Sequence, residues 1–355
     1  MKPSLMDFTK QELENIIQPK FRAKQIFGWL YHNYADDFSQ MKNIPKALKE
    51  ELSTNYVVNP LKIVNKEISS DGTVKYLLEL QDGKTMEAVW LKMKDDVYED
   101  GKLVQEAKYT ICVSTQVGCK VGCSFCLTAK GGFTRDLSAG EIVAQVVTLK
   151  KDNNHKHNRK INIVYMGMGE PLDNLKNLTQ AIKIFQEQDG LAISGKRQTV
   201  STSGLSNQID KLGEMDLGVH IAISLHAVDD ELRTELIPMN KAHNINSIIE
   251  AVKRFPIDTR KRVMFEYLVI KNKNDDIKSA KKLVKLLSGI KAKVNLIYFN
   301  PYPGTTYDRP ELKDMVAFQE YLVKHGLLCT IRDSKGIDIS AACGQLKEKN
   351  KEESK

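Results

Sequence analysis

From about residue 107 onward the sequence repeats one pattern, in which a strand is followed by a loop and then by a helix. Stretches that fit strands lie near 109–115, 161–166, 197–202, 218–224, 262–269 and 293–299, and a last one lies at 327–332. Helical patterns separate them, for example the stretch 276–287 and the capping box that runs from Ser138 to Glu141. The pattern predicts an α/β fold in which residues 107–346 form a partial (β/α)6 barrel of parallel strands.

The residues before these repeats follow other patterns. Residues 1–60 read as short helices, one of them opened by a capping box from Thr9 to Glu12. Residues 61–106 change to strand patterns, and Asp82-Gly83 is a strong signal for a hairpin turn between two of them. We therefore expect a small helical N-terminal accessory domain at 1–60, a β-hairpin adaptor at 61–106 and a disordered charged tail at 347–355.

Length and composition indicate a globular cytoplasmic protein. The chain has 355 residues, of which 41% are hydrophobic, and it is long enough to bury a core without disulfides. No stretch approaches the run of about 18 apolar residues that a membrane span needs, and the start has no apolar signal core. The net charge of +8 includes basic clusters at 20–24 and 253–262, which are compatible with an anionic partner.

Four of the six cysteines fall between residues 112 and 126, which points to metal or redox chemistry in a reducing compartment. Cys119, Cys123 and Cys126 follow the first strand of the repeats with spacings of three and two residues. Three thiolates spaced in this way can hold three irons of a [4Fe–4S] cluster and leave the fourth iron open. Structural zinc is the alternative, but it takes four ligands, and no fourth Cys or His stands at a usual spacing.

Polar residues and glycines also stand at the carboxyl ends of successive strands. In barrels of this kind, the ends of the strands line the mouth at which chemistry takes place. Glycine lets a ligand approach the backbone closely, and a glutamate can accept a hydrogen bond from an ammonium group. The residues at these positions are Gly169, Glu170, Ser201, Ser224, Leu225, His226 and Asn300.

The cysteine spacing, with Phe125 before the last cysteine, resembles the radical-SAM superfamily, whose open iron chelates S-adenosylmethionine (SAM). Beyond the superfamily, the chain is similar to the RlmN/Cfr family of RNA methyltransferases over nearly its whole length. The segments that carry this resemblance are 21–26, 112–119, 125–129, 167–171, 201–204, 223–226, 238–241, 300–304 and 341–346.

The resemblance implies the roles of the site residues. It implies SAM contacts at Gly169, Glu170, Ser201, Ser224, Leu225, His226 and Asn300. Cys343 would accept a methyl group from one SAM, and a radical generated from a second SAM would activate that group for addition to adenine. Glu87 would remove a proton from the base, and Cys112 would release the product by forming a disulfide with Cys343.

The resemblance also implies substrates and partners. The substrates would be carbon 2 of an adenosine in the peptidyl-transferase region of 23S rRNA and of the adenosine 3′ of the anticodon in tRNA. The N-terminal domain would help to bind RNA. A flavodoxin- or ferredoxin-type protein would donate electrons. The enzyme would be a monomer and would not associate with a membrane.

Two alternatives and several details stay open at this stage. A Cfr-type enzyme would methylate carbon 8 instead, although Pro171 and the segment 127–133 look like the carbon-2 branch. A non-catalytic zinc or iron–sulfur module that binds RNA would need no SAM pocket. Ser340 stands where the family usually has an aspartate, two residues after Asp338, and this departure is expected to alter the hydrogen bonding near Cys343. His155 and His157 are expected in a polar surface loop, and Cys329 in the core.

Overall fold

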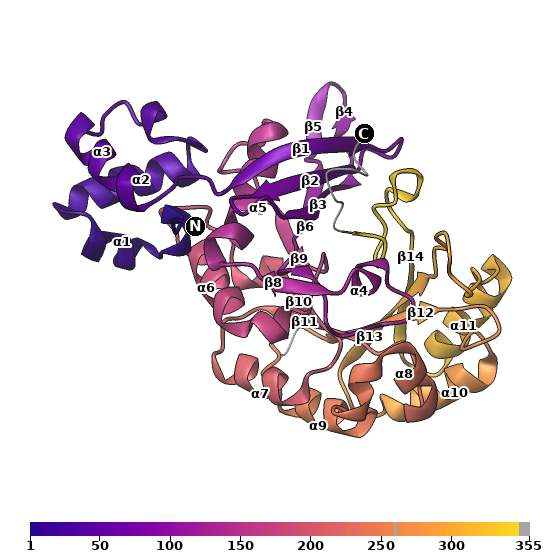
Figure 1. Cartoon of the computed structure of the whole chain (residues 1–355). Coiled ribbons are helices and arrows are strands. Elements are labelled where there is room, and N and C mark those ends of the chain that lie inside the picture. Colours follow the sequence, from indigo (N-terminus) through magenta and orange to yellow (C-terminus); the bar gives the residue numbers. More distant parts are fainter. Residues whose placement is uncertain (259–260, 348–355) are drawn as a thin grey trace.

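The computed structural model describes residues 1–258 and 261–347, and its centre is a curved sheet of ten strands (Figure 1). The order across the sheet is β1-β2-β3-β6-β9-β10-β11-β12-β13-β14. From β6 to β14 all neighbouring strands are parallel, whereas β1, β2 and β3 extend the sheet through antiparallel pairs. The parallel strands are β6 (Lys108–Cys112), β9 (Asn162–Tyr165), β10 (Gln198–Thr202), β11 (His220–Ser224), β12 (Val263–Val269), β13 (Ala292–Tyr298) and β14 (Leu328–Arg332).

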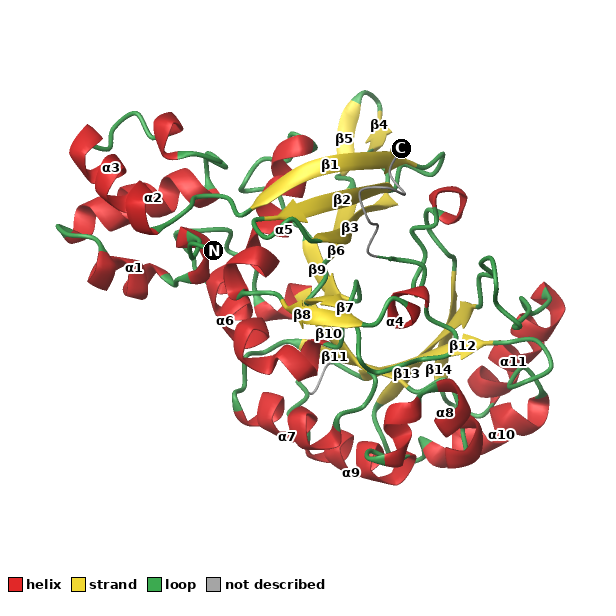
Figure 2. Cartoon of the chain, in the orientation of Figure 1, coloured by secondary structure: helices red, strands yellow, loops and turns green. Residues whose placement is uncertain are grey.

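Helices connect these strands and cover the outer side of the curved sheet, as Figure 2 shows. The short helix α4 (Leu127–Lys130) lies instead within the curve. The connecting helices are α5 (Ala139–Asp152), α6 (Leu175–Gln186), α7 (Ser206–Glu214), α8 (Asp230–Leu236), α9 (Ile245–Arg254), α10 (Ile277–Leu286) and α11 (Leu312–Lys324). The predicted α/β architecture, with six strand–helix repeats and a last strand, is confirmed.

The longer parallel strands β12 and β13 are mostly buried, because helices cover one face of the sheet and the other face encloses the site. In β13, for example, six of the seven residues are buried. The order of the strands leaves β1 and β14 as the two edges of the sheet, so the barrel is partial. The carboxyl ends of the parallel strands meet at one rim, which positions the residues that follow them.

The first hundred residues form a helical part and an antiparallel part, as their patterns predict. The helices are α1 (Lys10–Ile16), α2 (Lys20–Tyr31) and α3 (Lys46–Asn55), and the capping box between Thr9 and Glu12 is present at the start of α1. The strands β1 (Leu61–Ile68), β2 (Val74–Leu80) and β3 (Thr85–Lys94) follow, with the turn at Asp82-Gly83 between the last two. The division of the chain into domains at residues 60 and 106 remains a proposal.

The sequence patterns did not reveal two short hairpins. One consists of β4 (Val97–Glu99) and β5 (Lys102–Gln105), and the other of β7 (Gln116–Gly118) and β8 (Phe133–Asp136). Strands of three or four residues are too short to show a clear period.

The expected surface position is wrong for His155, which is 4% exposed and packs edge-on against the rings of Trp90 and Tyr109. Arg260 of the basic cluster and residues 348–355 of the tail lie outside the described residues. Among residues 1–258 and 261–347, no helix has the length and apolarity that crossing a membrane requires.

Candidate active site

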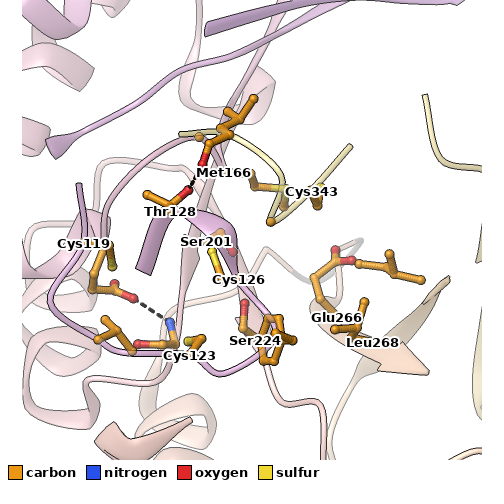
Figure 3. A pocket seen from close by; sticks show the side chains of 18 of the residues that line it. Cys119, Cys123, Cys126, Thr128, Met166, Ser201, Ser224, Glu266, Leu268 and Cys343 are labelled. Carbon is orange, nitrogen blue, oxygen red and sulfur yellow. Dashed lines mark hydrogen bonds between the residues drawn. The ribbon is translucent and has the colours of Figure 1, made fainter. Parts of the chain in front are cut away.

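A pocket inside the curve of the sheet brings together most of the residues that the sequence singles out (Figure 3). Of the predicted SAM contacts, Leu225 does not line this pocket; its backbone N–H donates to the carbonyl oxygen of Glu266 instead. The expected residues that do line it are Cys119, Cys123, Cys126, Gly169, Glu170, Ser201, Ser224, His226, Asn300 and Cys343.

The cysteine loop is held by the hairpin of β7 and β8. The backbone N–H of Cys119 donates to the carbonyl oxygen of Gly132 at 2.7 Å, and that of Cys126 to Cys123 at 3.1 Å. Gly118 has φ +75°, and a Cβ there would lie 2.0 Å from the oxygen of Gly132. Only glycine therefore allows the two sides of the hairpin to approach so closely.

The three thiols fit a [4Fe–4S] cluster better than a single zinc ion. In the described part of the chain, no group of three or more His, Cys, Asp or Glu side chains is arranged to hold one metal ion. In a cubane each thiolate binds a different iron, so the sulfurs surround a volume instead of one point. Burial raises the pKa of Cys119 to about 12 and also raises the pKa values of Cys123 and Cys126. Cys126 adds to the rise at Cys119 and Cys123, and Cys343 adds to the rise at Cys126. Bound iron reverses this effect, because a coordinating thiol is deprotonated.

Glu170 lines the pocket on the side of the three cysteines. Its Oε2 accepts a 2.7 Å hydrogen bond from the N–H of Ser203, and its Oε1 accepts one at 3.1 Å from the N–H of Leu172. Burial raises the pKa of Glu170, and these hydrogen bonds lower it. The preceding Gly169 has φ +102°, and a Cβ there would lie 2.6 Å from the side chain of Gln116. The carboxylate is therefore fixed in place beside the cysteine loop.

His226 is a neutral, fixed ring in the pocket. Its Nδ1 accepts a 3.0 Å hydrogen bond from the N–H of Leu268, so the remaining proton is on Nε2. Burial lowers the pKa of His226 to about 3, and the nearby charge of Arg233 lowers it further. Phe125 of the cysteine loop packs edge-on against the ring, with 5.0 Å between the ring centroids. His226 therefore offers a hydrogen-bond donor and no positive charge.

Arg233 organises this rim, although no sequence signal indicated it. It is fully buried, and its guanidinium donates to the carbonyl oxygens of Ser203, Ser224 and Leu225 and to Oδ1 of Asn240. These carbonyls follow two neighbouring strands, so one side chain ties both strand ends together. Arg233 lies in α8, whose charged sequence is typical of an exposed helix. The sequence pattern therefore gave no sign that this side chain is buried.

A second cavity adjoins the first. Cys112 lines the second cavity only, whereas Cys343, Met166 and Arg332 line both. Cys112 is buried, Cys343 is exposed, and both are free thiols. Burial raises the pKa of Cys112 to about 12, the neighbouring Cys343 raises it as well, and Arg332 lowers it. The structure thus brings the two predicted redox cysteines to one cavity from opposite ends of the repeats.

Glu87 is buried next to these cavities, and its side chain lines neither of them. Its Oε1 lies 3.7 Å from Nζ of Lys75, and its Oε2 accepts a 2.8 Å hydrogen bond from the N–H of Lys347. Val89 and Leu91, two and four residues further along β3, line the second cavity. Because strand residues two apart share a face, Glu87 faces the same side of the sheet.

The segment before Cys343 contains the departure from the family pattern. Ser340 has φ +52°, in the left-handed region that aspartate adopts more readily than serine. Asp338 accepts hydrogen bonds from Oγ of Ser69 at 2.6 Å and from the N–H of Ser70 at 3.1 Å. Asp338 therefore anchors this segment to the antiparallel strands. Cys329 is in the core, as expected.

Comparisons with known proteins agree with this geometry. A model of the radical SAM superfamily matches residues 113–284, and one of the ribosomal RNA large subunit methyltransferase N-terminal domain matches residues 4–58. The chain is 82% identical to the dual-specificity RNA methyltransferase RlmN of Sulfurimonas denitrificans, over 99% of both chains. It is 65% identical to the enzyme of the same name from Nitratiruptor sp., over 98% of both.

A solved structure is similar over nearly the whole length. It is a radical SAM methyltransferase from Sphaerobacter thermophilus, with 41% identity and a TM-score of 0.89. The match covers 97% of this chain and 99% of that one, so the N-terminal helices and the antiparallel strands are included.

Proposed function

Because this chain belongs to the RlmN family of radical-SAM RNA methyltransferases, we propose that it methylates carbon 2 of adenosine in RNA. The proposed substrates are an adenosine in the peptidyl-transferase region of 23S rRNA and the adenosine 3′ of the anticodon in tRNA. One observation carries the proposal. Cys343 lines both the pocket of the three cluster cysteines and the cavity that contains Cys112.

The enzyme uses a [4Fe–4S] cluster and SAM, and the residues of the pocket fit both groups. Cys119, Cys123 and Cys126 would hold the cluster, and the predicted SAM contacts lie around the same pocket. When bound, the two groups supply a carbon radical that can remove hydrogen from an inert C–H bond. Carbon 2 of adenine is electron-poor and does not attack SAM directly, so such chemistry is required.

Cys343 carries the methyl group in the proposed reaction. Its thiolate attacks the methyl carbon of one SAM and displaces S-adenosylhomocysteine, because thiolates are good nucleophiles. Once this S-methyl group has lost a hydrogen atom, its carbon bonds to carbon 2 of the base and links Cys343 to the RNA. The exposure of Cys343 at the meeting point of two cavities supports this role, because the sulfur must meet SAM and then RNA.

Glu87 and Cys112 complete the reaction. Glu87 removes the proton from carbon 2, and the unpaired electron that the addition leaves on the base would return to the cluster, which restores the aromatic ring. Cys112 then attacks the sulfur of Cys343 as a thiolate, and the bond from that sulfur to the methylene carbon breaks. The electron pair of that bond stays on the carbon, which takes a proton from water and becomes the methyl group of the released RNA. The product of this step is a disulfide between Cys112 and Cys343, which an external reductant must reduce before the next turnover.

The proposed partners follow from this cycle. A flavodoxin- or ferredoxin-type protein would deliver electrons to the cluster, and the enzyme would act as a cytoplasmic monomer. RNA-binding proteins contact phosphates through basic side chains. Helix α2 contains three basic residues, of which Lys20 and Lys24 are exposed and Arg22 is half-buried. This helix lies within the region that matches the methyltransferase N-terminal model. These side chains are therefore proposed to contact the RNA backbone.

The carbon-8 alternative is not favoured by the relatives, which carry the RlmN name at up to 82% identity. The decisive test is to incubate the anaerobically reconstituted protein with SAM, a reductant and unmodified 23S rRNA or tRNA. Mass spectrometry of the digested RNA should find 2-methyladenosine, and Cys343→Ala should abolish it while the cluster remains. Finding 8-methyladenosine, or no methylated RNA, would refute the proposed function.

A further inference from the structure

Glu266 is a buried carboxylate in the pocket to which the reaction assigns no role. It lies on β12, is 3% exposed and lines the pocket together with Ser224 and Leu268. Figure 3 shows it on the side of the pocket away from Cys119 and Cys123. Burying a charged group is costly unless its hydrogen-bonding capacity is used, so a carboxylate here calls for a partner.

One oxygen of this carboxylate is hydrogen-bonded, and the other has no hydrogen-bond partner. Oε1 accepts a 2.8 Å hydrogen bond from Nδ2 of Asn295 on β13, and Oδ1 of Asn295 accepts one at 2.8 Å from Thr330 on β14. Oε2 is inaccessible to solvent and has no hydrogen-bond partner. Nη1 of Arg332 lies 4.0 Å from Oε2, which is an ion-pair distance and too long for a hydrogen bond.

Burial and the neighbouring groups act in opposite directions on the pKa of Glu266. Burial raises the pKa of Glu266, whereas the charge of Arg332 and the hydrogen bond from Asn295 lower it. Arg332 thus offsets the charge of the carboxylate without satisfying its free oxygen. A donor from a bound ligand would complete the hydrogen bonding.

The sheet register places this free oxygen beside a predicted SAM contact. Ser224 on β11 and Glu266 on β12 are paired residues of neighbouring parallel strands, so their side chains project from the same face. Leu268 and Ile297, on the same faces of β12 and β13, also line the pocket. The row of inward residues shows that strands β11, β12 and β13 form this part of the pocket wall.

The two ends of the pocket differ in chemistry. At the cysteine end, Glu170 and the three thiols surround the place proposed for the cluster and for the amino-acid half of SAM. The nucleoside half must therefore extend away from the cysteines. Carboxylates recognise nucleosides through ribose hydroxyls in other folds, where an acidic residue accepts a hydrogen bond from the 2′-hydroxyl.

We infer that Oε2 of Glu266 accepts a hydrogen bond from a ribose hydroxyl of SAM, next to Ser224. This inference rests on the proposed function, because it takes SAM as the ligand of the pocket. Glu266 is then a binding residue that fixes the nucleoside while the sulfur end of SAM faces the cysteines and Cys343.

The test is a cycle of binding measurements on the anaerobically reconstituted holoprotein, by equilibrium dialysis without RNA. The ligands are SAM and its 2′-deoxy and 3′-deoxy analogues, and the proteins are the wild type, Glu266→Ala and Glu266→Gln. Iron content and cluster absorbance establish that each protein is loaded. Glu141→Gln is the matched control, because Glu141 is equally buried and lies outside the pocket, in an ion pair with Arg135.

Hydrogen bonds to charged groups change affinity by about 10- to 100-fold. The wild type should bind one of the two deoxy analogues about 10- to 100-fold more weakly than SAM. Glu266→Ala should bind SAM itself more weakly by the same factor, and it should bind SAM and that deoxy analogue equally well. Glu266→Gln should lose part of this affinity, because its amide oxygen would face Nδ2 of Asn295 and a neutral amide nitrogen would replace the accepting Oε2. The control should bind like the wild type.

Equal SAM affinity in the wild type and both Glu266 variants would overturn the inference, as would discrimination of the deoxy analogues that survives in Glu266→Ala. A separate filter-binding measurement with RNA covers the other ligand: if Glu266→Ala binds SAM normally and RNA weakly, the inference is overturned and the carboxylate belongs to the site of the RNA nucleoside. These outcomes are separate from the proposed function, which fails only if the wild-type holoprotein does not produce 2-methyladenosine.

Discussion

The backbone N–H of Lys347 donates a 2.8 Å hydrogen bond to Oε2 of Glu87, although 260 residues separate the two in the sequence. The chain segment that contains Cys343 therefore returns to β3 and contacts, at Lys347, the carboxylate proposed as the base. Lys75 approaches the other oxygen at 3.7 Å and also contacts Glu67 at 3.3 Å. Glu87 is thus held between a lysine on β2 and the C-terminal segment.

The first prediction concerns Glu87. Glu87→Gln should keep the cluster and the methylation of Cys343 but slow RNA methylation by about 10²- to 10⁴-fold, the usual contribution of a general base. Time courses of 2-methyladenosine formation, with mass spectrometry of the Cys343 peptide, measure both steps. Glu67→Gln is the control, since it removes the other carboxylate of Lys75. Equal slowing in both variants would show that the charge around Lys75 matters and not the base.

The second prediction concerns Cys112. If this residue resolves the intermediate, Cys112→Ala should still load Cys343 and form the bond to RNA, and then stall. A protein–RNA adduct that survives denaturant should accumulate, linked through the peptide of Cys343. Gel electrophoresis and mass spectrometry after digestion detect it. Normal multiple turnover would instead make Cys112 an ordinary buried residue of β6.

The third prediction concerns the cluster ligands. Replacing Cys119, Cys123 and Cys126 together with Ala should abolish iron–sulfur absorbance and SAM cleavage while far-UV circular dichroism stays near that of the wild type. The hairpin of β7 and β8 does not depend on the thiols, which is why the fold should persist. Cys329→Ala, at a buried cysteine outside the pocket, should retain iron. Bound iron–sulfur cluster in the triple variant would contradict the assignment.

The fourth prediction concerns Arg233. Arg233→Met should destabilise the protein by more than about 3 kcal/mol, because several buried carbonyls lose their donor at once. Urea unfolding of the holoprotein under anaerobic conditions measures the change. Arg254→Met, which removes an exposed ion pair with Asp210, should cost less than about 1 kcal/mol. Similar losses in the two variants would mean that Arg233 does not organise the rim.

The fifth prediction concerns pH and Lys150, which is fully buried in α5 with its Nζ 3.2 Å from the carbonyl oxygen of His157. Burial lowers the pKa of Lys150 to about 8. An unfolded lysine keeps its proton to about pH 10, so the unfolded state binds more protons between about pH 8 and 10. Stability should therefore rise with pH across that window, by up to about 3 kcal/mol.

The measurement is urea unfolding at several pH values for the wild type and for Lys150→Met. The variant should lack the rise and should be the more stable protein near pH 7, where the wild type must bury a charge. Lys151→Met, at a partly exposed neighbour that pairs with Asp36, should keep the rise. If the stability of the wild type and of Lys150→Met changed with pH in the same way, the pKa shift of Lys150 would not be the source of the rise.

Local patterns predicted a large part of the fold. The strands of the parallel sheet, the capping boxes at Thr9 and Ser138 and the turn at Asp82-Gly83 depend on residues close in sequence, and all of them are present. The hairpins of β4–β5 and β7–β8 were missed because they are shorter than a recognisable period. His155 was misplaced because its burial depends on Trp90 and Tyr109, which lie far away in the sequence.

The cysteine loop and the polar residues that end successive strands could be predicted, because strand and loop preferences act between neighbours along the chain. The cavity shared by Cys112 and Cys343, the link that Arg233 makes between two strand ends and the unpartnered oxygen of Glu266 could not be predicted from local patterns. Each of these depends on the order and register of strands that are distant in sequence. Such pairings are fixed by packing of the whole sheet, and no local pattern encodes them.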